Sequence, residues 1–180
     1  QNGDHWYADA YPDPIVGEDG VATVSGSGSG TLDLVAEGGA GPVTTDPVTA
    51  DILAGLVTGI TPAKAANSVD VAIAAGEAGI VLGAGELTLT YTGTTPDGDR
   101  PTRVFAQLVD DETGLVLGNQ ITPIPVTLDG TEQTVTVALE SVAHRVEPGD
   151  SLTLQVVATT VTYAPPRFGG TIDLSAVEVS

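Results

Sequence analysis

Two histidines and one short serine-glycine run are the residues of this chain whose types could serve nucleophilic catalysis. His144 lies in the passage VAHRVEPGD, and His5 stands beside Trp6 near the start. A serine hydrolase needs a nucleophile, a base and a group that orients the base. The run SGSGSG, Ser25 to Gly30, contains no Gly-x-Ser-x-Gly elbow, because the residue two positions from each serine is, on at least one side, serine rather than glycine. We therefore predict that both histidines are structural or surface groups, and we expect no catalytic residue in this segment.

Clustered carboxylates offer a second kind of chemistry. Asp97 and Asp99 lie in PDGDR, and Asp110 and Asp111 open the run DDETG. Adjacent residues on a hairpin tip do not face each other across a cleft, as the two carboxylates of a glycosidase must. Calcium suits such loops better, because a hard cation takes several oxygens. These four aspartates are therefore our calcium candidates, with solvated acidic turns as the alternative, and we expect no other cofactor.

The few aromatic side chains are a third group. The 180 residues include 1 Trp, 4 Tyr and 2 Phe, so the core must be built from Val, Leu, Ile and Ala. These rings could form a platform that stacks on sugars. They could instead plug the ends of an aliphatic sandwich or cover an interface with a neighbouring domain, and we favour these roles over sugar binding. The candidates for that interface are Trp6, Tyr11, Tyr163, Arg167 and Phe168.

The overall charge excludes several classes of protein. The chain has 24 acidic and 5 basic residues, a net charge of −19, and Lys64 is the only Lys or Arg among the first 99 residues. Binding to nucleic acid or to an anionic membrane surface needs clustered cations, so neither partner is expected. The absence of cysteine excludes disulfides, thiolate catalysis and Cys-ligated zinc. No apolar stretch approaches the ~20 residues of a membrane span, so no membrane insertion is expected.

The pattern along the chain predicts an all-β fold. We expect one domain, 1–180, in which residues 1–68 form an irregular section with glycine-rich loops, a strand at 31–36 and one short helix at 46–59. Alternation with period two then predicts strands. These lie at 69–75, 86–93, 102–111, 115–118, 121–128, 133–140, 151–161 and 171–179. Because no helix separates them, we predict an antiparallel β-sandwich of the jelly-roll type.

Several motifs resemble one known family. LTLTYTG at 87–93 and RPTRVFAQLVDDETGLVLGNQITPIPV at 100–126 resemble the C-terminal β-sandwich of the X-prolyl dipeptidyl aminopeptidase and cocaine esterase family of serine hydrolases. Similar features are VEPGDSLTLQV at 146–156 and the opening GDHWYADAYP. The residues that carry the match are Gly3, Trp6, Tyr11, Pro12, Val104, Phe105, Ala106, Leu108, Asp110 and Gly114. The glycine-rich insertion and the helix expected at 46–59 resemble those of the actinobacterial branch of this family.

The resemblance implies a galactose-binding-like sandwich appended to a catalytic α/β-hydrolase domain of the same chain. The expected role is that of a non-catalytic accessory domain, which packs on the catalytic domain and shapes substrate access in a secreted or cell-envelope enzyme. Two alternatives stay open. The sandwich could be a carbohydrate- or calcium-dependent binding module, or a structural domain of a cell-surface protein.

Overall fold

A computed structural model describes residues 24–40, 62–75, 79–147, 149–163 and 168–180. In these ranges the chain forms eleven strands and one 3₁₀ turn. Their bounds are β1 Val24–Asp33, β2 Ser68–Ala75, β3 Gly79–Gly83, β4 Glu86–Thr94, β5 Arg100–Asp110, β6 Leu115–Val116, η1 Leu117–Asn119, β7 Thr122–Leu128, β8 Glu132–Ala138, β9 Val142–Val146, β10 Leu152–Val157 and β11 Thr171–Val179. No helix within the described ranges is long and apolar enough to cross a membrane.

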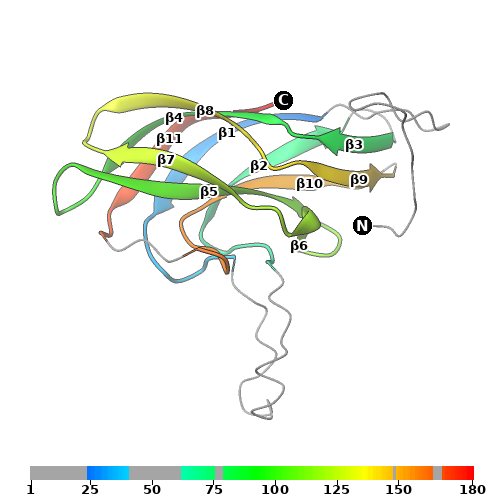
Figure 1. Cartoon of the computed structure of the whole chain (residues 1–180), viewed down its shortest axis with the longest axis horizontal. Coiled ribbons are helices and arrows are strands. Elements are labelled where there is room, and N and C mark those ends of the chain that lie inside the picture. The colour runs from blue at the N-terminus through cyan, green and yellow to red at the C-terminus, as the bar shows by residue number, and fades with distance from the viewer. Residues whose placement is uncertain (1–23, 41–61, 76–78, 148, 164–167) are drawn as a thin grey trace, which may run out of the picture.

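Nine of the strands form one antiparallel sheet that folds over on itself. Its order is β6-β5-β10-β2-β1-β11-β4-β8, and β7 also pairs with β5. Figure 1 shows β4 and β8 along one layer and β5 and β7 along the other. The two remaining strands, β3 and β9, pair as a separate ribbon. The fold is therefore an antiparallel β-sandwich, as the sequence predicted.

Aliphatic side chains from both halves of the sheet fill the space between the layers. Along β4, the even-numbered threonines are half-buried or exposed, while Leu87, Leu89 and Tyr91 are almost completely buried. They share one core with the inward side chains of β5, β7, β10 and β11. Burial of so many Leu, Ile and Val side chains is the main force that holds the two layers together.

The serine-glycine run is the main correction to the sequence prediction. We expected a strand at 31–36 preceded by glycine-rich loops, but β1 begins at Val24 and includes all of SGSGSG. The serines are exposed, whereas Gly26, Gly28 and Gly30 are half-buried on the same side as Leu32. A Cβ at Gly28 would lie 2.8 Å from a methyl of Val71 on β2. The missing side chains therefore let β2 pack closely against the backbone of β1.

This glycine strand forms the corner of the sandwich. It pairs with β11 from Gly26 to Asp33, but its ladder with β2 covers only Val24 and Ser25. The register with β11 also shifts between Gly28 and Gly30, as in a β-bulge. Bulges and glycines increase twist and bending in a sheet. The sheet accordingly turns from one layer into the other at β1.

The short segment directly before β2, which carries Ala63 and Ala65, covers the outer face of β5 and β10. The fully buried Gln155 side chain accepts a hydrogen bond from the Ala65 N–H at 2.8 Å and donates one to the Ala65 carbonyl at 3.1 Å. It also accepts one at 3.0 Å from Gln107, its partner across the β10–β5 ladder. Beside this network lies a small second core formed by Ala40, Ala65, Phe105, Ile121 and Val157.

Three other local predictions remain, and two of them can be compared with the structure. The predicted helix at 46–59 lies outside the described residues. The predicted strand at 151–161 ends as β10 at Val157, and the predicted strand at 115–118 is a two-residue strand followed by η1. Strands β3 and β9 were not predicted, because GIVLG and VAHRV are short and lack strict alternation.

Candidate functional site

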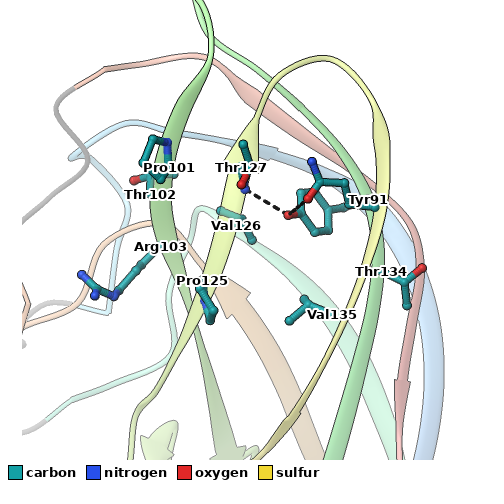
Figure 2. A pocket seen from close by; sticks show the side chains of 10 residues that line it. Tyr91, Pro101, Thr102, Arg103, Pro125, Val126, Thr127, Thr134 and Val135 are labelled. Carbon is teal, nitrogen blue, oxygen red and sulfur yellow. Dashed lines mark hydrogen bonds between the residues drawn. The ribbon is translucent and has the colours of Figure 1, made fainter.

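A groove of about 490 Å³ lies where the free edges of β7 and β8 face each other. Figure 2 shows the side chains that surround it. They come from β4, β5, β7 and β8 and are Tyr91, Pro101, Thr102, Arg103, Pro125, Val126, Thr127, Gln133, Thr134 and Val135. Ligand sites in proteins commonly occupy about 300–1,000 Å³, so the groove has the size of a binding site.

The β7 wall of the groove offers hydrogen-bond acceptors but no free donors. The Thr127 N–H donates to the Tyr91 hydroxyl at 3.0 Å, so it points away from β5. In an antiparallel ladder every second residue points the same way, which places the backbone groups of Pro123 and Pro125 on this side too. Proline has no N–H, and it occurs in sheets mainly where that group would face outward. The edge therefore presents carbonyl oxygens alone.

A chain of hydrogen bonds fixes the inner part of the groove. The buried Tyr91 hydroxyl donates to Gln133 Oε1 at 3.2 Å while it accepts from Thr127. The Gln133 amide donates in turn to Asp129 Oδ2 at 2.8 Å. Hydrogen bonds from the backbone and side chain of Thr131 hold the pKa of Asp129 below its ordinary value, so this carboxylate stays charged as the acceptor. The half-buried Gln133 side chain is thus positioned before any ligand arrives.

Arg103 forms the outer rim of the groove beside Pro125, its cross-strand neighbour on β7. Its exposed side chain extends from β5 away from Tyr91 (Figure 2). Lys64 pairs with Asp111 at 2.7 Å and Arg145 with Glu147 at 2.8 Å. Within the described ranges Arg103 has no such ion pair. An available guanidinium is notable in a chain whose net charge is −19.

A second cavity, of about 310 Å³, contains His144. Asp110, Thr113 and Asn119 are among the residues that line it, and its described lining includes no serine. Burial lowers the pKa of His144, and its Nδ1 atom is buried without a hydrogen-bond partner in the described part of the chain. The Thr113 hydroxyl already donates to Asp110 at 2.8 Å. The arrangement thus resembles no nucleophile–base pair.

The four calcium candidates do not come together. Asp97 and Asp99 are exposed in the turn between β4 and β5. Asp110 accepts hydrogen bonds from the Glu112 N–H and the Thr113 hydroxyl of its own turn. Among the described residues no group of three or more His, Cys, Asp or Glu side chains could hold a metal ion.

Asp111 also has its carboxylate engaged within the fold. It accepts from Lys64 Nζ at 2.7 Å and from the Thr153 hydroxyl at 2.8 Å. Burial acts to raise the pKa of Asp111, but these hydrogen bonds outweigh it and bring the pKa below its ordinary value. The carboxylate thus ties the turn after β5 to the segment that carries Lys64.

The predicted interface residues are only partly visible. Trp6, Tyr11 and Arg167 lie outside the described residues. Tyr163 is 38% exposed and stacks on Phe105, with ring centroids 4.8 Å apart and planes at 15°. Phe168 is also 38% exposed, and the Arg100 guanidinium lies 5.7 Å from its ring centroid. Each ring therefore has one side in contact with the fold and one side open to a partner.

Comparison with known proteins adds little. No family model matches the chain, and no curated protein matches it. A solved structure described as "CBM4 structure and function" is similar to 66% of this chain over 87% of its own length, with 13% identity and a TM-score of 0.32. A likeness at this level carries no argument about function, so the assignment of the chain to the antiparallel β-sandwiches rests on the strand pairing described above.

Proposed function

We propose that this β-sandwich is a non-catalytic binding module that holds a neutral polysaccharide along the groove between β7 and β8. The observation that carries the proposal is the combination, at one strand edge, of an available arginine, a fixed glutamine and a row of carbonyl acceptors.

The groove offers the contacts that a sugar chain uses. The carbonyl oxygen of Pro125 in the groove, and that of Pro123 further along the same strand edge, can accept from sugar hydroxyls, while Arg103 and Gln133 can donate to them. The pyrrolidine ring of Pro125 offers an apolar surface to the C–H faces of a sugar ring. A groove that follows a strand edge suits an extended polymer better than a compact ligand.

The charge of the module supports a neutral ligand. The net charge of −19 repels anionic polymers at long range. A single guanidinium on the rim can form several hydrogen bonds to neutral hydroxyls without reversing that repulsion. Uronic-acid polymers are therefore expected to bind more weakly than uncharged ones.

Affinity electrophoresis in gels containing xylan, mixed-linkage β-glucan or galactomannan tests the proposal. At least one polymer should retard the full chain, and R103A should weaken that retardation about tenfold or more, because a hydrogen bond to a charged group contributes about 1.5–3 kcal/mol. R100A is the matched control, since it removes the same charge outside the groove. Absence of retardation in all three gels would contradict the proposal, and so would equal retardation of R103A and R100A.

The accessory-domain hypothesis is a second candidate, and the exposed rings of Tyr163 and Phe168 support it. In that case the segment packs on an α/β-hydrolase domain of a longer secreted or cell-envelope protein. The mass of the natural gene product tests this directly. A product of several hundred residues that cleaves peptides or esters is expected, and a native product near 18.0 kDa would overturn this candidate.

A further inference from the structure

The free edge of β8 carries unpaired backbone groups. The Leu139 N–H donates to the Gly85 carbonyl, and the Glu86 N–H donates to Ser180 on the far side of β4. Odd-numbered residues of β8 therefore bond to β4, and even-numbered residues point outward. The N–H and C=O groups of Thr134 and Thr136 accordingly have no partner in the described part of the chain.

This edge lacks the usual protection against pairing with another strand. Natural edges are blocked by proline, lysine, bulges or inward-pointing charges. The facing edge of β7 is blocked by Pro123 and Pro125, whereas β8 reads EQTVTVA and has no proline, glycine or lysine. Its one charge, on Glu132, stands at the first position of the strand.

The strand is self-complementary when two copies run antiparallel about Val135. In that register Thr134 lies opposite Thr136 of the other copy, and Glu132 lies opposite Ala138, so no two like charges meet. The outward-pointing groups of both strands then exchange hydrogen bonds. The same pairing of hydroxyls already exists within one copy, where Thr136 bonds to Thr88 at 2.9 Å and Thr134 to Thr90 at 3.2 Å.

We propose that β8 is a self-association edge, at which a second copy of this chain adds its own β8 antiparallel and joins the two sheets into one. The half-buried side chains of Val135 and Val137 gain apolar contacts in that arrangement. Gln133 and Val135 also line the groove, so a second copy and a groove ligand exclude each other. The test below contains no polysaccharide and is independent of the proposed function.

Sedimentation equilibrium of the full 180-residue chain over a series of NaCl concentrations tests this proposal. Association should strengthen as salt rises, because screening reduces the repulsion between two chains of charge −19. T134E/T136E should weaken association about tenfold or more, since it places two pairs of like charges directly opposite each other. T134K/T136E should still associate, since each lysine then faces a glutamate.

A matched control separates the effect of charge placed at the edge of β8 from the effect of charge placed elsewhere on the same face of the sheet. T88E/T90E adds the same charge as T134E/T136E on the same outer face, one strand further in, and should associate as the wild type does. A wild-type chain that stays monomeric at every salt concentration would overturn the proposal. So would equal association of T134E/T136E and T134K/T136E, provided that circular dichroism shows both variants folded.

Discussion

Replacing Gln155 with leucine should destabilise the fold, because this side chain accepts from the buried Ala65 N–H, which has no other partner in the described part of the chain. The Gln155 amide binds both the N–H and the carbonyl of Ala65, and Ala65 is only 6% exposed. The Ala65 carbonyl keeps a hydrogen bond from the Ser68 hydroxyl at 3.3 Å. A buried polar group left unpaired costs about 1–3 kcal/mol, so the Ala65 N–H alone predicts a loss of about 1–3 kcal/mol. Of the other partners of Gln155, Ser68 and Asp70 are half-buried and exposed and can turn to water. The third, the buried Gln107 amide, keeps the Ala63 carbonyl as an acceptor at 3.4 Å.

Urea unfolding followed by circular dichroism measures this loss in Q155L against the wild type. The matched control is Q120L, because Gln120 is exposed and its side chain makes no hydrogen bond within the described ranges. Its free energy of unfolding should change by less than about 0.5 kcal/mol. A loss below about 1 kcal/mol in Q155L, or equal losses in both variants, would refute the reasoning that the amide anchors the segment at Ala65.

Three further predictions concern the corner, the acidic turn and the groove. G28V should lower stability by about 1–3 kcal/mol in thermal unfolding, because its Cβ would crowd Val71. The pKa of Asp111 lies below its ordinary 3.8, so its pair with Lys64 stabilises the fold above that pH and is lost as the pH falls through the lowered pKa. The difference in urea midpoint between wild type and D111N should therefore shrink on acidification from about pH 5 to pH 2. Y91F should cost about 1–2 kcal/mol in calorimetry, because one backbone N–H loses its acceptor.

Each of these has an outcome that contradicts it. S27V changes an exposed side chain of the same strand, so G28V must be clearly less stable than S27V. A D111N difference that stays constant down to pH 2 would mean that the ion pair adds no stability. Y91F with wild-type stability would mean that water replaces the hydroxyl at Thr127.

The strands were predictable where buried and exposed side chains alternate along the chain. Alternation in TVTVALE predicted Val135 and Val137 on one side and Thr134 and Thr136 on the other, and the structure has them so. The strand predicted at 102–111 is likewise present as β5, in which Val104, Phe105 and Ala106 are buried.

The glycine corner and the site were not predictable in the same way. Serine and glycine have low strand preference, so SGSGSG read as a loop. What stabilises it as a strand is packing against Val71, a contact between distant parts of the chain. Arg103 lies at the rim of the groove and Gln133 inside it because of how the sheet folds over, and local sequence carries no signal for that. The alternating prolines of ITPIPVTL are a sign of a protected edge that is visible in the sequence.

The position of β11 in the sheet has a consequence for how the chain is made. This strand, the last in sequence, lies between β1 and β4 and pairs with both. A nascent chain that has not yet exposed residues 171–179 therefore cannot close its sheet, and the edges of β1 and β4 remain open during synthesis. Closure joins segments about 140 residues apart, and such non-local pairing is slow. The sheet can therefore close only after β11 has left the ribosome, and the net charge of −19 opposes the association of open edges until then.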